Sequence, residues 1–171
     1  MTADVAPRRL LTGGSRKTVL TVHVASAVAL VGSSAGLLIT SVRAATRAET
    51  GQAHTLYELI QLLAFTLGIP CSFIALGSGA TLALTSRWGI LRHWWVTAKL
   101  ALLLATILTG ALVTRRGIDA MLDGTAPGGT GDHGAQWTLV ASVAVQLGMV
   151  LTATVLAVFK PAGRTPWSST G

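Results

Sequence analysis

Four long apolar stretches dominate this chain of 171 residues, at about 18–41, 57–83, 94–114 and 137–159. Each is long enough to span a membrane, because about 20 mostly apolar residues cross roughly 30 Å of hydrocarbon as a helix. Hydrocarbon offers the backbone no hydrogen-bond partner, so helices are the structure compatible with such stretches. The sequence therefore predicts an all-α membrane protein, folded as an antiparallel four-helix transmembrane bundle.

The composition agrees with a membrane protein and argues against a nucleic-acid-binding protein. The chain is 51% hydrophobic and 11% charged, whereas a soluble domain carries about 25% charged residues. The net charge of +7 lies almost wholly between the apolar stretches, which suits contact with anionic lipid head groups. Nucleic-acid binders gather basic and aromatic residues on one face, and this sequence does not. The expected partner is the lipid bilayer, with no nucleic acid.

The lysines and arginines outside the apolar stretches predict the orientation of the spans. Eight lie in residues 1–17, 84–93 and 160–171: Arg8, Arg9, Arg16, Lys17, Arg87, Arg92, Lys160 and Arg164. Four lie in residues 42–56 and 115–136: Arg43, Arg47, Arg115 and Arg116. Because cytoplasmic segments carry the excess of positive charge, both termini are expected in the cytoplasm, with the chain in a plasma membrane.

The chain is expected to form one transmembrane domain, residues 18–159, between a disordered arm (1–17) and a disordered tail (160–171). The first apolar stretch is much longer than the 7–15 apolar residues of a signal peptide, so it is interpreted as a retained span. The third helix is expected to continue through RRGIDAMLDG to Gly124, with Asp119 one turn from Arg115.

Small residues mark the faces on which the helices are expected to pack, since close backbone approach stabilises helix association in lipid. On the first span these residues are Ala25, Ala29, Gly32 and Gly36, and on the second they are Ala75 and Gly79. The Gly32 face could meet another span of the same chain or a second copy, and the sequence leaves both open. Pro70 removes a backbone donor, so a kink is expected in the second span, with Thr66 bonding locally beside it.

His23 and Lys99 are the candidate binding residues, because ionisable groups inside a membrane are functional suspects. Each lies about five residues into its span, and parallel spans would place both near the same membrane face. Lys99 is expected to be an anchor that reaches the interface beside Trp94 and Trp95. The alternative is a buried site that Lys99 forms with His23.

Other polar residues in the spans suggest a polar path, formed by Glu58, Gln61, Ser142 and Gln146. The Gly-rich spacing of Asp119, Asp123, Asp132 and His133 matches no common metal site, so no metal is expected. Motifs for nucleophilic catalysis or phosphate binding are absent from the sequence, and Cys71 is its single cysteine. No catalytic residue is assigned, which favours a protein that is not an enzyme.

The segment SRWGILRHWWVTAKLALLLATIL resembles the signature of a bacterial, largely actinobacterial, family of four-span membrane proteins of unknown function. In that family, too, a histidine opens the first span, here in LTVHVASAV. More distantly, a histidine in helix one with a lysine in helix three is similar to haem-binding protoporphyrinogen oxidase-type membrane proteins. The opening of the third span is similar to that of copper-resistance D-type proteins. The chain lacks the later histidines of the former and a methionine cluster for copper.

Three hypotheses follow for the function. The first is a non-enzymatic membrane protein that packs with itself or with another membrane protein, as an interaction or accessory protein. The second is a haem-binding or redox membrane protein that uses His23 with Lys99. The third is a small transporter or transporter accessory with the polar path described above. The first is favoured, because the sequence contains no complete set of chemically active residues.

Overall fold

The computed structural model describes residues 13–47, 49–85, 94–129 and 131–159, apart from the side chains of Arg47 and Thr50. Within this part every regular element is a helix. The order is α1 (Gly13–Arg47), α2 (Thr50–Leu63), η1 (Ala64–Gly68), α3 (Ile69–Leu84), α4 (Trp94–Thr109), η2 (Gly110–Thr114), α5 (Arg115–Thr125) and α6 (His133–Phe159). The elements η1 and η2 are short π-helical turns inside longer helices.

These elements form four helical rods that are long and apolar enough to cross a membrane: Gly13–Thr46, Gly51–Leu84, Trp94–Thr125 and His133–Phe159. All four expected spans lie inside them, and the predicted all-α four-helix bundle is confirmed. The chain is thus a multi-pass membrane protein. Most of the predicted arm and all of the predicted tail, together with residues 86–93, lie outside the described residues.

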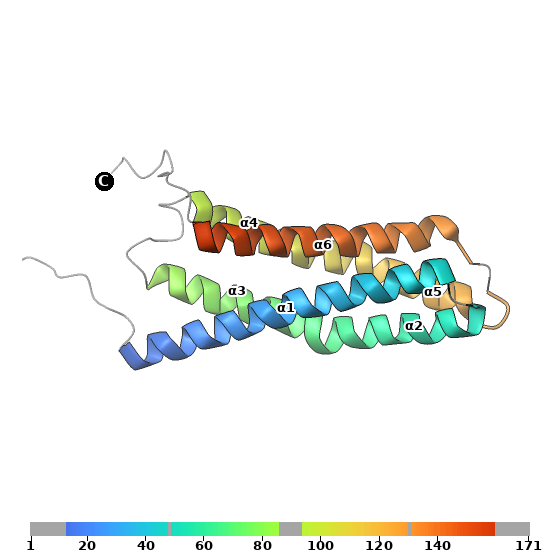
Figure 1. Ribbon diagram of the computed structural model, residues 1–171, viewed down its shortest axis with the longest axis horizontal. Coiled ribbons are helices and arrows are strands. Elements are labelled where there is room, and N and C mark those ends of the chain that lie inside the picture. The colour runs from blue at the N-terminus through green and yellow to red at the C-terminus, as the bar shows by residue number, and fades with distance from the viewer. Residues whose placement is uncertain (1–12, 48, 86–93, 130, 160–171) are drawn as a thin grey trace, which may run out of the picture.

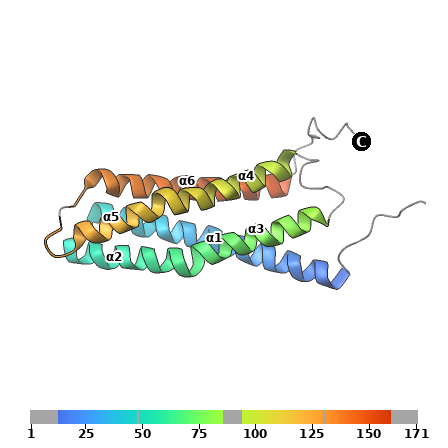
Figure 2. The ribbon, with the colours of Figure 1, turned by 180° about the vertical axis from the view of Figure 1, so that it is seen from behind.

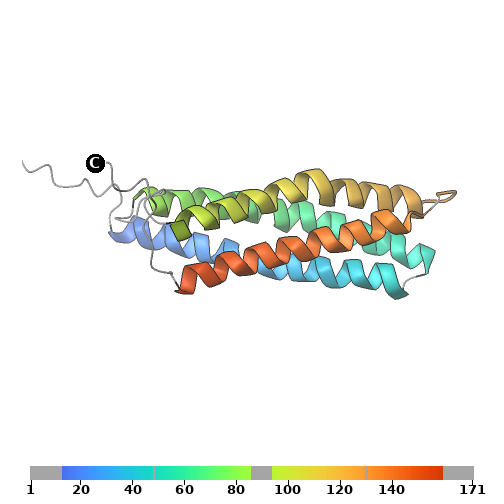
Figure 3. The same cartoon turned by 90° about the horizontal axis from the view of Figure 1, so that it is seen from above.

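The four rods run side by side and alternate in direction (Figures 1 and 3). The first rod packs against the second and the fourth, and the third rod also packs against these two. Among the described residues, α1 makes no close backbone approach to α4 or α5. The first and third spans are therefore diagonal neighbours across the bundle.

The bundle has two distinct ends, visible in Figure 1. The end where α1 begins and α6 ends is called the terminal end here. The opposite end, which carries the turn before α2 and the segment between α5 and α6, is called the loop end.

All four rods are longer than the apolar stretches that predict them. The first three contain 32 to 34 residues, which corresponds to about 50 Å at a rise of 1.5 Å per residue. At the loop end the third rod continues through the charged segment to Thr125, and Arg115 Nε lies 3.9 Å from Asp119 Oδ2. At the terminal end α1 begins at Gly13, five residues before the expected start, and the Thr21 hydroxyl donates to the Lys17 carbonyl there.

The second span changes direction between α2 and α3 (Figure 2). The turn η1 ends at Gly68, two residues before Pro70. Proline has no amide hydrogen and its ring crowds the preceding turn, so a wider π turn lets the helix continue past it. Thr66 Oγ1 donates to the Leu62 carbonyl at 2.7 Å, which is the local bond expected beside the kink.

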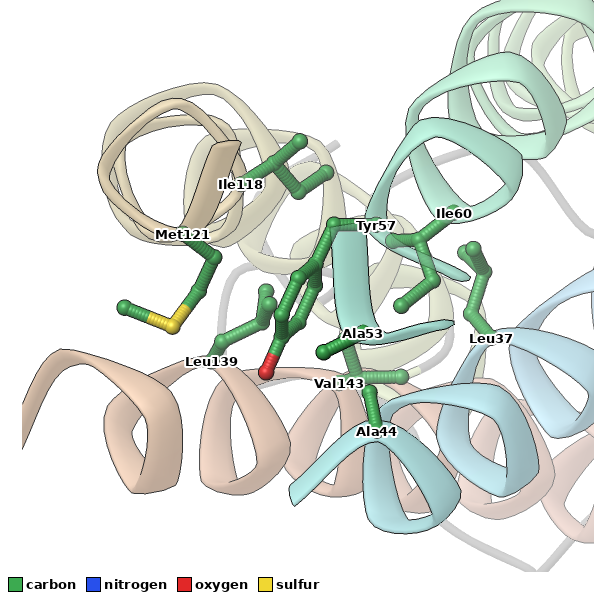
Figure 4. Close-up of a cluster of buried hydrophobic side chains, with 9 residues drawn as sticks. All are labelled: Leu37, Ala44, Ala53, Tyr57, Ile60, Ile118, Met121, Leu139 and Val143. Carbon is green, nitrogen blue, oxygen red and sulfur yellow. The ribbon is translucent and has the colours of Figure 1, made fainter. Parts of the chain in front are cut away.

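Most of the large apolar residues that are buried gather toward the loop end (Figure 4). This core cluster contains Leu37, Ala44, Ala53, Tyr57, Ile60, Ile118, Met121, Leu139 and Val143. It draws side chains from all four rods, and five of its large members, Tyr57, Ile60, Ile118, Leu139 and Val143, are at most 1% exposed. The cluster fixes the relative positions of the four rods at that end, and so positions the polar groups described next.

Candidate functional site

His23 connects the first and second spans near the terminal end. Its Nδ1–H donates to the Ala75 carbonyl and to the Ser78 hydroxyl oxygen, each at 3.1 Å. The Ser78 hydroxyl in turn donates to the Ile74 carbonyl at 2.6 Å. Because these carbonyls can only accept, the bonds assign the ring hydrogen to Nδ1.

Gly79 makes room for the His23 ring. A Cβ atom placed at Gly79 would lie 3.0 Å from Cε1 of the ring, closer than such contacts normally are. Ala75, one turn earlier, is 3% exposed. The small residues Ala75 and Gly79 therefore form the surface of α3 on which His23 of α1 packs.

The small residues of the first span have a different environment. A Cβ at Gly32 or Gly36 would meet no atom within 4 Å, and Ala25 is exposed while Ala29 is half-buried. Within the chain, this face is not where helices pack closely. Packing at Gly32 and Gly36 would therefore require a second copy or another membrane protein, and otherwise the face contacts lipid.

Lys99 lies at the same end of the bundle as His23, on the diagonal span. Its Nζ is 5.5 Å from the centre of the Trp95 ring, one turn nearer the terminal end, which is the geometry of a cation–π contact. Lys99 is half-buried, so its position suits an interfacial anchor.

A relay of side-chain hydrogen bonds connects the third and fourth spans. The Gln146 amide donates to Thr114 Oγ1, and the Thr114 hydroxyl donates to Ser142 Oγ at 3.1 Å. The Ser142 hydroxyl then donates to the Leu139 carbonyl at 2.8 Å. Thr114 is the last residue of the π turn η2, so the wider turn carries the residue at the centre of the relay.

Two further contacts hold the second span to its neighbours near the loop end. The Gln136 amide of α6 donates to the Tyr57 hydroxyl oxygen at 3.1 Å, and His54 Nδ1 lies 2.9 Å from Thr125 Oγ1 of α5. The other ring nitrogen of His54 is 3.7 Å from Glu58, whose side chain is 61% exposed.

The residues suggested as a polar path are divided between two places. Ser142 and Gln146 belong to the relay, whereas Glu58 is an exposed partner of His54. Gln61 of α2 is half-buried, and no hydrogen bond joins it to the relay in the described part of the chain. The four residues are thus not connected as one continuous chain.

A cavity of about 340 Å³ opens at the loop end, beyond the core cluster. Its apolar walls include Ala44, Ala45, Ala53 and Met121, and its polar groups come from Tyr57, Thr125, Asp132, His133 and Gln136. Figure 4 shows the Tyr57 hydroxyl pointing toward α6, the helix that carries Gln136. Gly129 in the wall has no room for a side chain, because a Cβ there would collide with the Asp123 carbonyl.

The exposed charges indicate where the hydrocarbon ends on the loop side. Glu58 and Arg115 lie at the loop-side limits of the uncharged stretches 59–84 and 100–114, and both side chains are exposed, at 61% and 64%. Trp137 is 52% exposed on α6, as is typical of an interfacial aromatic residue. The part of the bundle beyond these residues, which includes the cavity, therefore projects from the hydrocarbon.

The described residues contain no group of three or more His, Cys, Asp or Glu side chains that could hold a metal ion.

The sequence analysis did not predict that His54, Tyr57, Thr114, Thr125 and Gln136 take part in hydrogen bonds between helices. Polar residues in or beside apolar stretches indicate candidates for such bonds, but their partners depend on how each helix is rotated about its axis.

Comparison of the chain with protein-family models, with curated proteins and with solved structures gives no match.

The contact between His23 and Gly79 predicts opposite outcomes for two similar substitutions. Gly79→Val should displace the His23 ring, break its bonds to α3, and lower the thermal unfolding midpoint of the purified protein by several degrees. Gly32→Val should leave the midpoint unchanged or raise it, because Gly32 borders open space and glycine is a poor helix former. Equal midpoints for the two variants would contradict the packing role of Gly79.

A pair of double-mutant cycles separates the two interpretations of Lys99. His23→Ala with Ser78→Ala should show a coupling of about 0.6 kcal/mol in unfolding free energy, as is usual for hydrogen bonds between membrane helices. His23→Ala with Lys99→Met should be additive within about 0.5 kcal/mol, and Lys99→Arg should be tolerated, if Lys99 is an anchor. A His23–Lys99 coupling larger than the His23–Ser78 coupling would instead indicate a buried site shared by the two residues.

Proposed function

We propose that this chain is a non-enzymatic protein of the bacterial plasma membrane that acts by binding, as an interaction or accessory protein. The observation that carries this proposal is that the buried polar side chains bond to one another or to backbone. In the described part of the chain, no buried side-chain nitrogen or oxygen lacks a hydrogen-bond partner. Catalysis and transport need polar groups aimed at a substrate, whereas paired groups hold helices together.

The loop end is the part of the molecule that we assign to binding. It projects beyond the charged rim at Glu58 and Arg115, and it has a packed apolar core. A packed end of this kind presents a stable surface to a partner, which is either a second copy of the chain or another membrane protein. The excess of lysine and arginine on the terminal side supports an orientation with both termini in the cytoplasm and the loop end outside.

Photo-crosslinking in living cells tests this assignment. A benzoylphenylalanine placed at Asp123, which is exposed at the loop end, should give a protein adduct. The same residue at Val28, 67% exposed in the middle of the first span, serves as the lipid-facing control and should give none. An adduct at twice 17.6 kDa would identify a second copy as the partner, and a larger or smaller increment would identify another protein.

The opposite pattern would overturn the proposal. Adducts from Val28 alone would make the lipid-facing side the interaction surface, and adducts from neither position would remove the interaction role. The orientation is measured in the same cells with Asp123→Cys in a Cys71→Ser background. A membrane-impermeant maleimide should label this cysteine from outside, and a protected cysteine would reverse the orientation.

Haem binding is the second candidate function, and one observation favours it. With the ring hydrogen on Nδ1 and engaged by Ala75, His23 keeps the lone pair of Nε2 for a ligand, which is how an axial histidine is held. The other histidines of the described ranges, His54 and His133, lie at the loop end, so within these ranges His23 is the one histidine placed to act as such a ligand.

An absorption spectrum separates the two candidates. Protein purified from haem-supplemented cells should show no Soret band if His23 serves packing alone. A Soret band that disappears in His23→Ala, but persists in the loop-end control His54→Ala, would establish haem binding and displace the first candidate.

A further inference from the structure

The cavity at the loop end combines features that the packing of the bundle does not require. It is larger than the space of a few water molecules, at about 340 Å³, and lies within the size range of small-ligand sites. One part of its wall is apolar, from Ala44, Ala53 and Met121, and another part is polar, from Tyr57, Thr125, Asp132, His133 and Gln136. A ligand with an apolar body and one polar end would match such a wall.

Three polar residues of the wall, Asp132, Gln136 and Thr125, carry hydrogen-bond acceptors, while the Tyr57 hydroxyl hydrogen and the His133 ring are further polar groups there. Asp132 Oδ1 accepts from the Gly134 amide at 2.8 Å, which leaves the second carboxylate oxygen for another donor. The Gln136 amide nitrogen is directed to Tyr57, so its side-chain carbonyl oxygen also stays an acceptor. Thr125 donates its own hydrogen to the Met121 carbonyl at 2.6 Å and presents its oxygen as an acceptor to His54.

The charge distribution of the chain agrees with a cationic ligand at this end. Segments 42–58 and 115–136 hold five of the six acidic residues, namely Glu49, Glu58, Asp119, Asp123 and Asp132, against four of the thirteen lysines and arginines. This end is therefore slightly acidic in a chain whose net charge is +7. The electric field of this excess negative charge attracts small cations and repels anions.

From this geometry we infer that the loop-end cavity binds a small organic ammonium ion with a short hydrocarbon body. The ammonium group donates to the Asp132 carboxylate and the Gln136 carbonyl oxygen, and the hydrocarbon lies against Ala44, Ala53 and Met121. This inference rests on the proposed function, because it names a ligand for the end of the molecule that is assigned to binding.

A matched set of three probes tests the inference on the full chain in lipid nanodiscs. Saturation-transfer NMR titrations compare n-butylammonium, 1-butanol and butyrate, which share a hydrocarbon body and differ in charge, with empty nanodiscs as the blank. Butylammonium should bind about tenfold more tightly than butanol, because it forms a charge-assisted hydrogen bond. Butyrate should bind most weakly, since the Asp132 carboxylate repels it.

Three variants locate the site. Asp132→Asn keeps an oxygen to cap the Gly134 amide, and it should reduce butylammonium binding to the level of butanol. Asp123→Asn, which neutralises an exposed carboxylate outside the cavity wall, should leave the preference unchanged. Ala45→Leu should fill part of the cavity and weaken both butylammonium and butanol.

Two results would overturn the inference: equal binding of butylammonium and butanol by the wild-type chain, or a preference that survives both Asp132→Asn and Ala45→Leu. The crosslinking experiment at Asp123 reports on protein partners whatever these titrations show. Failure of the cavity as an ammonium site is therefore distinguishable from failure of the proposed function.

Discussion

A polar side chain inside a bilayer must find its hydrogen-bond partner within the protein, because hydrocarbon offers none. Two helix–helix contacts of the bundle meet this constraint with side-chain bonds, at His23 between the first and second spans and at Thr114 between the third and fourth. Each contact ends on a backbone carbonyl, which has a spare lone pair even inside a helix. The polar groups therefore stabilise particular helix neighbours and also specify which neighbour each helix takes.

The same constraint gives the two π turns a structural role, because they change which residues of a helix face its neighbours. Each lies within a span, and η2 brings Thr114 to a position between Gln146 and Ser142 on α6. A π turn contains one more residue than the corresponding α-helical turn, so it rotates the residues that follow relative to those that precede. In the second span Pro70 accounts for the turn. In the third span no proline is present, and Gly110, at which η2 begins, lies against Gln146.

The fold was predictable from the sequence because the hydropathy of each segment indicates whether hydrocarbon or water surrounds it. The four stretches that predict spans lie inside the four observed rods, and Asp119 lies beside Arg115, as expected if the third helix continues past Arg115. The partners of the polar residues were not predictable. His23 and Ser78 are 55 positions apart, and their contact depends on the rotation of two helices, which hydropathy does not encode. The cavity depends on how four helix ends and a glycine-rich segment meet, so no local pattern marks it.

The distribution of buried side chains supports a boundary between hydrocarbon and water near Glu58 and Arg115. Between those residues and the terminal end, small buried residues (Ser26, Ser33, Ser34, Ser72, Ala75 and Thr106) outnumber the larger Leu30, Val96 and Val150 outside the core cluster. Small groups of this kind let helices approach in lipid. Toward and beyond the rim, the buried set changes to the larger side chains of the core cluster, with Tyr57, Ile118 and Met121 past the rim itself. Burial of large apolar groups stabilises packing strongly where water is the alternative, and weakly where lipid is. The apolar core therefore lies where the bundle emerges from the hydrocarbon, and packed side chains of that core form one wall of the cavity.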